Sequence, residues 1–486
     1  MLPTKLASWE AEVTPQEYLR HDAVGLAELV RRGETSPDTL LDAAMDAIAE
    51  VNGDLNVVVS TFEEEARAEI ASGLPDGPFK GVPFLLKDLT AHYAGKPTGS
   101  AWAPRLNRPA REDTELVKRY RRAGLVIFGK TTVPELAMDW STESRAHGAS
   151  RNPWGTSRTT GTSSGGSAAA VAAGIVPMAH GNDGGGSIRV PASCCGVFGM
   201  KPSRGRNPAA PDGDRWMGML CEHALTWTVR DNAALLDVTA GPHPHQFYNA
   251  PMGKDFAAEV GRAPGKLRIA VSTNAPYGAA THPDCIRAVE DQVSLLEDLG
   301  HTCEWRDIDL PENGWRGFNI MINAEYAADM AIEERILGRP VGPKDFAPVI
   351  WDIIKLGRAI SATDYILGIA STHQVARAVL SIFDEYDVFL SPTLAKPPVP
   401  LGSFDLTVTP EEHYSNYLAW MPYTHVFNIS GSPAMSVPGM RDVDGLPIGC
   451  QFAARPSDEA LLFRLAGQLE AARPWATLRP PIHYGA

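Results

Sequence analysis

The sequence has no apolar run of the roughly 18 residues that a membrane-crossing helix requires. Its first 20 residues carry three glutamates and no apolar stretch of the kind that a secretory signal contains. Cysteine is scarce: there are six, none in a CxxC pair, which argues against a disulfide framework and against a zinc site of that kind. We therefore expect a cytoplasmic protein with no membrane partner.

Positive charge is also in short supply. The 44 lysines and arginines are outnumbered by 58 acidic residues, giving a net charge of −14. Nucleic-acid binding depends on basic side chains that neutralise phosphates, so no nucleic-acid partner is expected. The chain also lacks an HExxH motif, a P-loop and a Rossmann fingerprint, so we expect neither a metal nor a cofactor.

What the chain does have is enough apolar sequence for a large core and an alternation of strand and helix patterns. It has 486 residues, of which 44% are hydrophobic. Ser36-Pro37-Asp38 predicts a helix start, with serine as N-cap and proline in the first turn. An apolar strand at 81–86, a helix at 116–123, a strand at 125–128 and a turn at 129–131 follow. This alternation indicates an α/β fold.

Three glycines precede Ser187. Gly184-Gly185-Gly186 allows a tight turn, and consecutive backbone N–H groups in such a turn form an anion-binding nest. A serine placed there would have its own oxyanion hole, whose donors are worth roughly 3–4 kcal/mol of barrier each. The alternative interpretation, a plain glycine loop that binds phosphate, is equally compatible with these four residues alone.

A second serine cluster spans 161–166. Its first five residues match G-x-S-x-G, the nucleophile elbow of α/β-hydrolases, with Ser163 at the centre. That elbow requires an apolar strand before it, and residues 155–160 are polar and contain no such strand. An esterase built on Ser163 would also need a downstream histidine, for which His425 and His483 are the candidates. A flexible linker is disfavoured because the cluster runs straight into an alanine-rich helix.

Lys87 follows the apolar run at 81–86 and should be buried. Lysine is rarely buried without a partner, and desolvation lowers its pKa, which makes a neutral amine available as a base. A Ser–Lys pair is a known way to activate a nucleophile. Taken alone, this lysine is better explained by a salt bridge to Asp88 or a nearby carboxylate.

Together, these three elements resemble the amidase signature family. The segment from 161 to 191 is similar to the defining segment of that family, and the two serines are 24 residues apart, at 163 and 187. Further similar motifs lie at 81–88, 129–135, 151–154, 199–203 and 428–451. The resemblance covers about 22–469 and implies one domain, 1–486, with a mixed central β-sheet covered by helices on both faces. Within it, 1–60 would be an N-terminal helical region and 255–380 a helix-rich, variable region on the substrate side.

The resemblance implies a catalytic role for each serine and for the lysine. Ser187 would be the acyl nucleophile, Ser163 the bridging serine after a cis peptide bond, and Lys87 the base and acid that moves protons through Ser163. The amides of Gly184, Gly185, Gly186 and Ser187 would form the oxyanion hole. The implied function is hydrolysis of C–N bonds in amides or carbamates, with the α/β-hydrolase-type esterase and a glutamine amidotransferase subunit as alternatives. The acidic charge disfavours the amidotransferase, which must contact tRNA.

The substrate is expected to be small and apolar or aromatic. Met138, Ser141, Trp216 and Phe427 are the predicted pocket residues, and such side chains suit aryl amides, urethanes or short nylon-type amides. Many relatives have Gly-Thr-Asp at 181–183. This chain has Gly-Asn-Asp there, and in this respect it resembles the branch of the family that hydrolyses cyclic nylon oligomers. That branch has a pocket cysteine, and the corresponding stretch here, 322–325, has none. A homodimer is compatible with these features.

Overall fold

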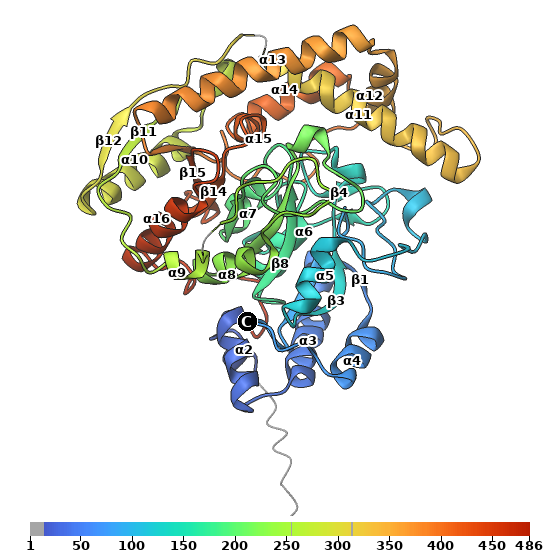
Figure 1. Cartoon of the computed structure of the whole chain (residues 1–486), viewed down its shortest axis with the longest axis vertical. Helices are drawn as coiled ribbons and strands as arrows, with labels where there is room; N and C mark the ends of the chain where they lie inside the picture. The colour runs from blue at the N-terminus through green and yellow to red at the C-terminus, as the bar shows by residue number, and fades with distance from the viewer. Residues whose placement is uncertain (1–13, 254, 313) are drawn as a thin grey trace, which may run out of the picture.

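The computed structural model describes residues 14–253, 255–312 and 314–486. A single mixed sheet of 11 strands runs through the described chain, with helices on both of its faces (Figure 1). The predicted α/β domain is therefore confirmed. The strands of this sheet are β1 (Val58–Thr61), β2 (Pro83–Lys87), β3 (Val126–Thr131), β8 (Met178–Asp183), β9 (Phe198–Lys201), β10 (Cys221–Thr226), β11 (Arg268–Val271), β12 (Thr302–Trp305), β13 (Val388–Pro392), β14 (Ala434–Arg441) and β15 (Pro447–Ala454).

Two small ribbons lie outside this sheet: β4 (Glu143–Ser144) pairs with β5 (Gly148–Ala149), and β6 (Arg151–Asn152) pairs with β7 (Gly155–Thr159). The helices are α1 (Pro15–Tyr18), α2 (Ala23–Arg32), α3 (Pro37–Leu55), α4 (Glu63–Ser72), α5 (Glu115–Arg122), α6 (Gly165–Ala172), α7 (Arg189–Cys195), α8 (Val229–Thr239), α9 (Phe256–Glu259), α10 (Pro283–Asp298), α11 (Gly314–Leu337), α12 (Pro348–Ala359), α13 (Ala362–Ser381), α14 (Pro410–Trp420), α15 (His425–Ile429) and α16 (Glu459–Ala472).

The strand order is β1-β3-β2-β8-β10-β9-β14-β15-β13-β11-β12. β2 is parallel to both of its neighbours, β3 and β8. Each of the next neighbouring pairs is antiparallel: β8 with β10, β10 with β9, β9 with β14, β14 with β15, and β15 with β13. Parallel neighbours end at the same edge of a sheet. The carboxyl ends of β2 and β8, which carry Lys87 and Asp183, therefore lie side by side.

Small residues let two helices pack tightly in the centre of the molecule. All eight residues of α6 are buried, and its sequence consists of glycine, serine, alanine and one valine. A Cβ at Gly165 or Gly166 would collide with Thr142 or Thr132, so neither position has room for a larger residue. α6 and α7 thus lie directly against the sheet, while α8, α10 and α16 pack with the other face.

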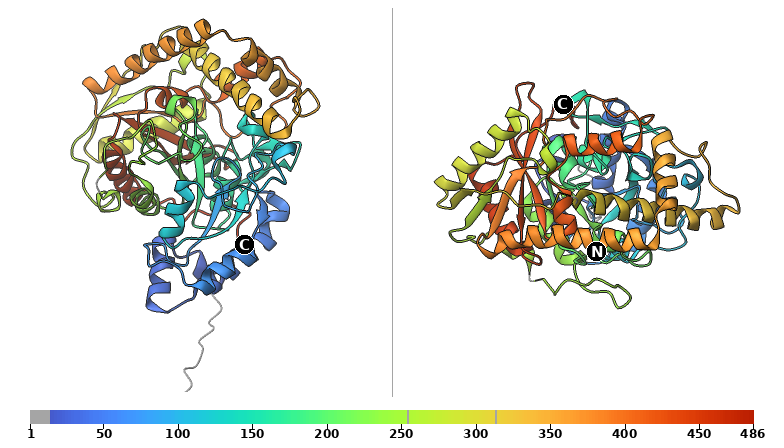
Figure 2. Two further views of the ribbon diagram at one scale, coloured as in Figure 1. Left: turned by 45° about the vertical axis from the view of Figure 1, so that its right-hand side comes forward. Right: turned by 90° about the horizontal axis from the view of Figure 1, so that it is seen from above.

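Within residues 255–380, α11, α12 and α13 form an outer layer over one end of the sheet, as Figure 2 shows, whereas β11 and β12 belong to the sheet itself and α10 packs on it. The segment Ala362–Asp384 has a mean hydropathy of 1.3 in its most apolar window. By length and composition alone this helix could cross a membrane, and it is the one such helix among the described residues. This helix was not identified as such from the sequence pattern. It packs on α11 and buries Gly368, Thr372, Val375 and Val379.

The local sequence signals had mixed outcomes. Ser36 caps α3 by accepting the Thr39 N–H at 3.0 Å, as predicted. The turn predicted at 129–131 is wrong, because β3 continues through Thr131 and pairs there with Lys87 of β2. Residues 155–159 do form a strand, but in a two-stranded ribbon outside the central sheet. Residues 1–13 of the predicted N-terminal helical region lie outside the described residues.

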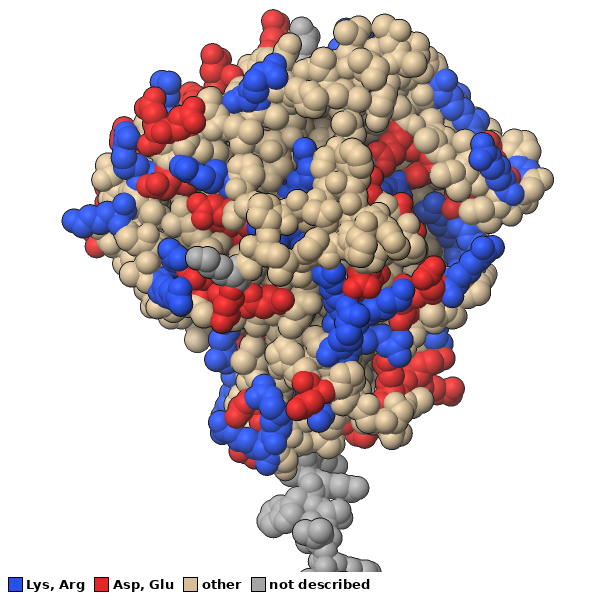
Figure 3. Space-filling model, in the orientation of Figure 1, with Lys and Arg blue, Asp and Glu red and all other residues tan. Residues whose placement is uncertain are grey.

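Acidic and basic side chains alternate over the face shown in Figure 3. No extended basic field covers this face, and its upper part, over α13, carries few charges.

Candidate active site

Two parallel strands deliver the first polar groups of the site. Lys87 is the last residue of β2 and is completely buried. Its Nζ lies 2.7 Å from Ser163 Oγ and 2.6 Å from Asn182 Oδ1, at the end of β8. Burial lowers the pKa of Lys87 to about 7, although the negative charges of Glu222 and Asp183 oppose the shift. Close to neutral pH the amine can therefore lose its proton and act as a base.

Ser163 reaches Lys87 because the start of α6 is tied to β8. Ser167 Oγ donates to the His180 carbonyl at 2.7 Å, and Ser164 Oγ donates to the Asn182 carbonyl at 3.2 Å. The Ser164 N–H also donates to the Ser187 carbonyl at 3.2 Å, which joins the two serine loops. The peptide bond between Thr162 and Ser163 is cis, as the family resemblance implied.

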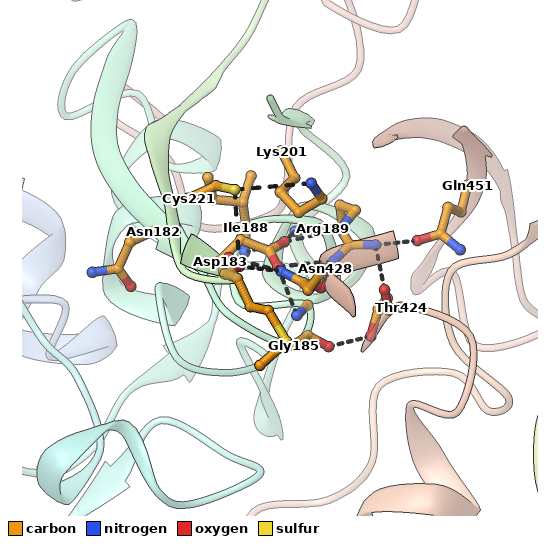
Figure 4. Close-up of polar contacts among 12 residues, drawn as sticks. Asn182, Asp183, Gly185, Ile188, Arg189, Lys201, Cys221, Thr424, Asn428 and Gln451 are labelled. Carbon is orange, nitrogen blue, oxygen red and sulfur yellow. Dashed lines mark hydrogen bonds and ion pairs between the residues drawn. The ribbon is translucent and has the colours of Figure 1, made fainter. Parts of the chain in front are cut away.

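Asp183 organises the glycine loop that precedes Ser187 (Figure 4). Its carboxylate accepts the N–H groups of Gly186 at 2.8 Å and Ile188 at 3.2 Å. Arg189 donates to both carboxylate oxygens, at 2.8 and 2.9 Å, and both side chains are fully buried. The charge of Arg189 holds the pKa of Asp183 well below its usual range despite burial.

The guanidinium of Arg189 is saturated by other parts of the chain. It donates to the Thr424 carbonyl at 2.8 Å, to Gln451 Oε1 at 2.7 Å and to Asn428 Oδ1 at 2.6 Å. Figure 4 shows these groups gathered around it from α15, β15 and the residue before α15. The loop is therefore held from both sides by a fully paired ionic cluster.

This arrangement leaves three backbone donors beside Ser187. The N–H groups of Gly184, Gly185 and Ser187 have no acceptor among the described residues. Gly186 differs from the prediction, because its N–H is taken up by Asp183. The Gly185 carbonyl is held by the hydroxyls of Tyr417, at 2.8 Å, and Thr424. The available oxyanion donors are therefore those of 184, 185 and 187.

Ser187 is half-buried and lies where two lobes of a cavity meet. The first, the polar lobe, has a volume of about 530 Å³ and contains Arg105, Arg215 and Asp329 as well as Ser163 and Asn182. Arg215 pairs with Asp329, and Arg105 pairs with Glu333 at 2.8 Å. The charges of this lobe are therefore balanced within it or just behind it.

The second, the aromatic lobe, has a volume of about 540 Å³ and lies on the other side of Ser187. Its rings pack on one another, with centroids 4.8 Å apart for Trp315 and Tyr417 and 4.9 Å apart for Trp140 and Tyr417. Both lobes are lined by Ser187 and also by Ala137, Trp216 and Tyr326. The further lining residues of the aromatic lobe include Met138, Phe318, Asn319, Ile322, Tyr414 and Met421.

Trp216 separates the lobes by lying over the glycine loop. Its ring occupies the space that a Cβ at Gly184 would take, so only glycine fits at that position. The backbone N–H of Trp216 donates to Glu325 Oε2 at 2.6 Å, and the indole ring meets Tyr326 edge-on, with centroids 5.9 Å apart. The indole therefore touches both the predicted oxyanion loop and helix α11.

Two of the four predicted pocket residues lie elsewhere. Met138 and Trp216 line the cavity as expected. Ser141 is buried behind it, where its hydroxyl pairs with Thr159 Oγ1 at 2.7 Å. Phe427 packs against Phe389, with centroids 5.9 Å apart, and faces a different surface hollow, because α15 turns that side chain away from Ser187.

The main contribution missed by the sequence patterns is one face of α11. Trp315, Phe318, Ile322, Tyr326 and Asp329 follow at helical spacing, and all line the cavity. Such spacing is readable as an apolar stripe, but nothing in it distinguishes a pocket from a core. The stretch 322–325 without cysteine lies here, and its Ile322 lines the aromatic lobe.

The competing interpretations of these residues do not match the geometry. Lys87 Nζ is bonded to Ser163 and Asn182, whereas Asp88 lies 3.8 Å from Lys130 Nζ. His425 is buried among aromatic rings, and neither of its ring nitrogens has a partner in the described part of the chain. His483 pairs with the Pro480 carbonyl. Neither histidine contacts Ser163, which removes the esterase arrangement.

Comparison with known proteins agrees with this geometry. The family model for amidase matches residues 39–463. The chain belongs to the amidase signature family. Amidases of this family hydrolyse amides, and this chain is an amide hydrolase. It is 37% identical over 482 residues to the 6-aminohexanoate-cyclic-dimer hydrolase of Paenarthrobacter ureafaciens, which covers 96% of this chain and 97% of that protein.

Two solved structures of amidases superimpose closely on this one. The structure of 6-aminohexanoate cyclic dimer hydrolase complexed with substrate has a TM-score of 0.90 and 36% identity, covering 96% of this chain and 99% of that one. A bacterial aryl acylamidase of the amidase signature family has a TM-score of 0.85 and 27% identity, covering 94% of this chain and 97% of that one. Both are similar to this amidase over nearly its whole length.

Replacing Asp183 with asparagine should destabilise the amidase by about 3–5 kcal/mol, because the buried Arg189 charge loses its partner. Urea unfolding of Asp183→Asn measures the loss. Glu304→Gln is the matched control, since Glu304 pairs with Arg268 at 3.0 Å while both side chains are more than a third exposed. The control should cost less than about 1 kcal/mol. Equal losses in the two variants would contradict the role given to the buried pair.

Proposed function

We propose that this amidase cleaves C–N bonds of small amides or carbamates through an acyl-enzyme on Ser187, with Ser163 and Lys87 moving the protons. The observation that carries this proposal is the buried hydrogen bond from Lys87 to Ser163 beside three unpaired amides and Ser187. The described residues show no hydrogen bond between the two serine hydroxyls. Contacts of this kind are often long before substrate binds.

The proposed reaction has two halves. Ser187 Oγ attacks the carbonyl carbon while its proton passes to Ser163 Oγ and the Ser163 proton passes to the neutral amine of Lys87. The amides of Gly184, Gly185 and Ser187 face the oxygen that becomes negative. The leaving nitrogen takes a proton back through Ser163 as its bond to carbon breaks. Water then attacks the acyl-enzyme by the same proton route and releases the acid.

The two lobes give the substrate a direction. Ser163, which returns the proton to the leaving nitrogen, lines the polar lobe, whereas the aromatic lobe is lined by Thr162 and Gly185 on the other side of Ser187. The amine part should therefore lie in the polar lobe and the acyl part in the aromatic lobe. This favours aryl or apolar acyl groups joined to a polar amine.

The relatives support the same substrate range. One is named for hydrolysis of a cyclic dimer of 6-aminohexanoate and another is an aryl acylamidase. We therefore propose aryl amides, short nylon-type amides and aryl carbamates as substrates. Glutamine, a small zwitterion, is a poor match for a lobe lined by seven aromatic side chains, which disfavours the amidotransferase role. The six free cysteines fit the reducing cytoplasm, and a homodimer stays a prediction.

Removing the nucleophile or the base should abolish turnover without unfolding the protein. We expect Ser187→Ala to lower kcat by about 10⁴-fold or more, and Lys87→Ala by about 10²–10⁴-fold. An aryl anilide assay, with thermal unfolding as the control, measures both. A fluorophosphonate should label Ser187 and leave Ser163 unmodified. Wild-type rates in Ser187→Ala on every amide tested would end the proposal.

The activity should rise with pH through about pH 7. Lys87 has a pKa lowered to about 7, and only its neutral amine can accept a proton. Below that pH the amine is charged and kcat/KM falls; above it kcat/KM reaches a plateau. Glu470, whose pKa burial raises to about 7, is bonded to the Val229 N–H away from the site and serves as the control. Glu470→Gln should keep the same profile. A flat profile from pH 5 to 9 is incompatible with a lysine base.

The direction of the substrate is testable by separating acylation from deacylation. Asp329→Asn, in the polar lobe, should change only acylation, because the amine has left before water attacks. Phe318→Leu, in the aromatic lobe, should slow both steps by about tenfold. Single-turnover rates and partitioning of the acyl-enzyme to hydroxylamine measure the two steps for anilides that share an acyl group. The reverse pattern would place the acyl group in the polar lobe.

A further inference from the structure

The amine of Lys87 has two side-chain partners of different kinds. Ser163 Oγ, at 2.7 Å, can donate or accept a hydrogen bond, whereas Asn182 Oδ1, at 2.6 Å, can only accept one. A neutral amine has two N–H groups and one lone pair. One N–H must therefore point at Asn182, which leaves the lone pair free to face Ser163.

The orientation of the Asn182 amide is itself determined by its neighbours. Its Nδ2 donates to Thr90 Oγ1 at 2.8 Å, and the Thr90 hydroxyl donates to the Leu89 carbonyl at 2.6 Å. A carbonyl only accepts, so the single hydroxyl hydrogen of Thr90 is already used and its oxygen must accept. The Asn182 amide group therefore faces Thr90 with its nitrogen and Lys87 with its oxygen.

We propose that Asn182 and Thr90 are positioning residues, which aim the lone pair of the Lys87 amine at the hydroxyl of Ser163. The proposal rests on the proposed function, in which Lys87 is the base. The row of hydrogen-bonded groups then runs from the Leu89 carbonyl through Thr90, Asn182 and Lys87 to Ser163, and the donor and the acceptor of each hydrogen bond in it are fixed. Ser163 donates to Lys87, and the Ser163 oxygen is left to receive the proton of Ser187.

The residue type at 182 is what makes this row directional. A threonine hydroxyl at that position could donate or accept and would leave the amine free to turn. The asparagine oxygen gives Lys87 only one option. Thr90 is half-buried and lines the same polar lobe as Ser163 and Asn182, so the row runs along one side of the cavity.

The charges that face Lys87 come from three strands. Asp183 and His180 lie on β8 and Glu222 lies on β10, where Glu222 pairs with His180 at 2.8 Å. His180 Nδ1 accepts the Lys87 backbone N–H at 3.3 Å, so it is unprotonated on that nitrogen. Lys130, on β3, turns instead to Asp88 and Thr98. No carboxylate contacts Nζ in the described residues, and the neutral oxygen of Asn182 occupies that place.

The experiment measures pH profiles of kcat/KM on one anilide for four variants. Asn182→Asp puts a negative charge against Nζ, which stabilises the ammonium and should move the acid limb up by about 1–3 pH units. Asn182→Leu removes the acceptor and should lower the plateau by about 10²-fold with KM unchanged. Thr90→Val, which frees the amide to flip, should cost about tenfold. Thr90→Ser, which keeps the hydroxyl, should retain the wild-type plateau.

Thr98→Val is the matched control. Thr98 accepts a hydrogen bond of 2.6 Å from Lys130, a buried lysine outside the site whose pKa is lowered to about 8. Loss of that contact should leave the acid limb in place. The proposal is overturned if Asn182→Asp keeps the wild-type limb or if Thr90→Val and Thr90→Ser behave alike. Lys87→Ala, measured beside them, tests the proposed function separately: its kcat must fall by about 10²–10⁴-fold whatever the outcome at 182 and 90.

Discussion

The buried ion pair of Asp183 and Arg189 is the interaction on which the site depends. Asp183 ends β8 and Arg189 begins α7, so the pair closes the five-residue loop that carries Ser187. Two charges taken out of water are expensive unless every hydrogen-bonding position is filled. Asn428, Gln451 and the Thr424 carbonyl fill them from the carboxyl-terminal part of the chain. The loop thus acquires its shape only when segments over 200 residues apart have come together.

The two buried lysines of neighbouring strands, Lys87 on β2 and Lys130 on β3, have different polar partners. Lys130 lies 3.8 Å from a carboxylate, and its other partners are Thr98 and the Ala91 carbonyl. Lys87 has a hydroxyl and an amide oxygen instead, and no carboxylate among the described residues forms an ion pair with its Nζ. Desolvation lowers the pKa of both amines, and a carboxylate opposes the shift at close range at Lys130, whereas Glu222 and Asp183 oppose it at Lys87 without an ion pair to its Nζ in the described residues.

The sequence was sufficient for the parts of the site that lie next to each other along the chain. An apolar strand ending in Lys87 and three glycines before Ser187 are local patterns, and both are where they were expected. The α/β class followed from the same strand and helix alternation. The sequence could not predict contacts between side chains that are far apart along the chain. Ser141 and Phe427 were misplaced because their neighbours in sequence say nothing about which way a loop or a short helix turns.

The aromatic lobe illustrates the same limit from the other side. Its rings come from α11, α14, the segment after β3 and the loop before β10 that carries Trp216, and only their meeting makes a cavity. The helical spacing on α11 was visible, yet a stripe that faces a pocket has the same period as one that faces a core. The Gly186 donor was misassigned for a related reason: the Asp183 carboxylate that claims it is three residues away but turns toward it only through Arg189.

The contact between Trp216 and Gly184 links specificity to chemistry. One face of the indole borders both lobes, while its ring edge rests in the space left by the missing Cβ of the oxyanion loop. The wall between the two lobes and the glycine loop before Ser187 are consequently packed as a single unit. Redesigning this enzyme for bulkier substrates by trimming the indole would also take away the lid that keeps the loop in shape, so room gained for the substrate and rigidity of the loop cannot be varied independently.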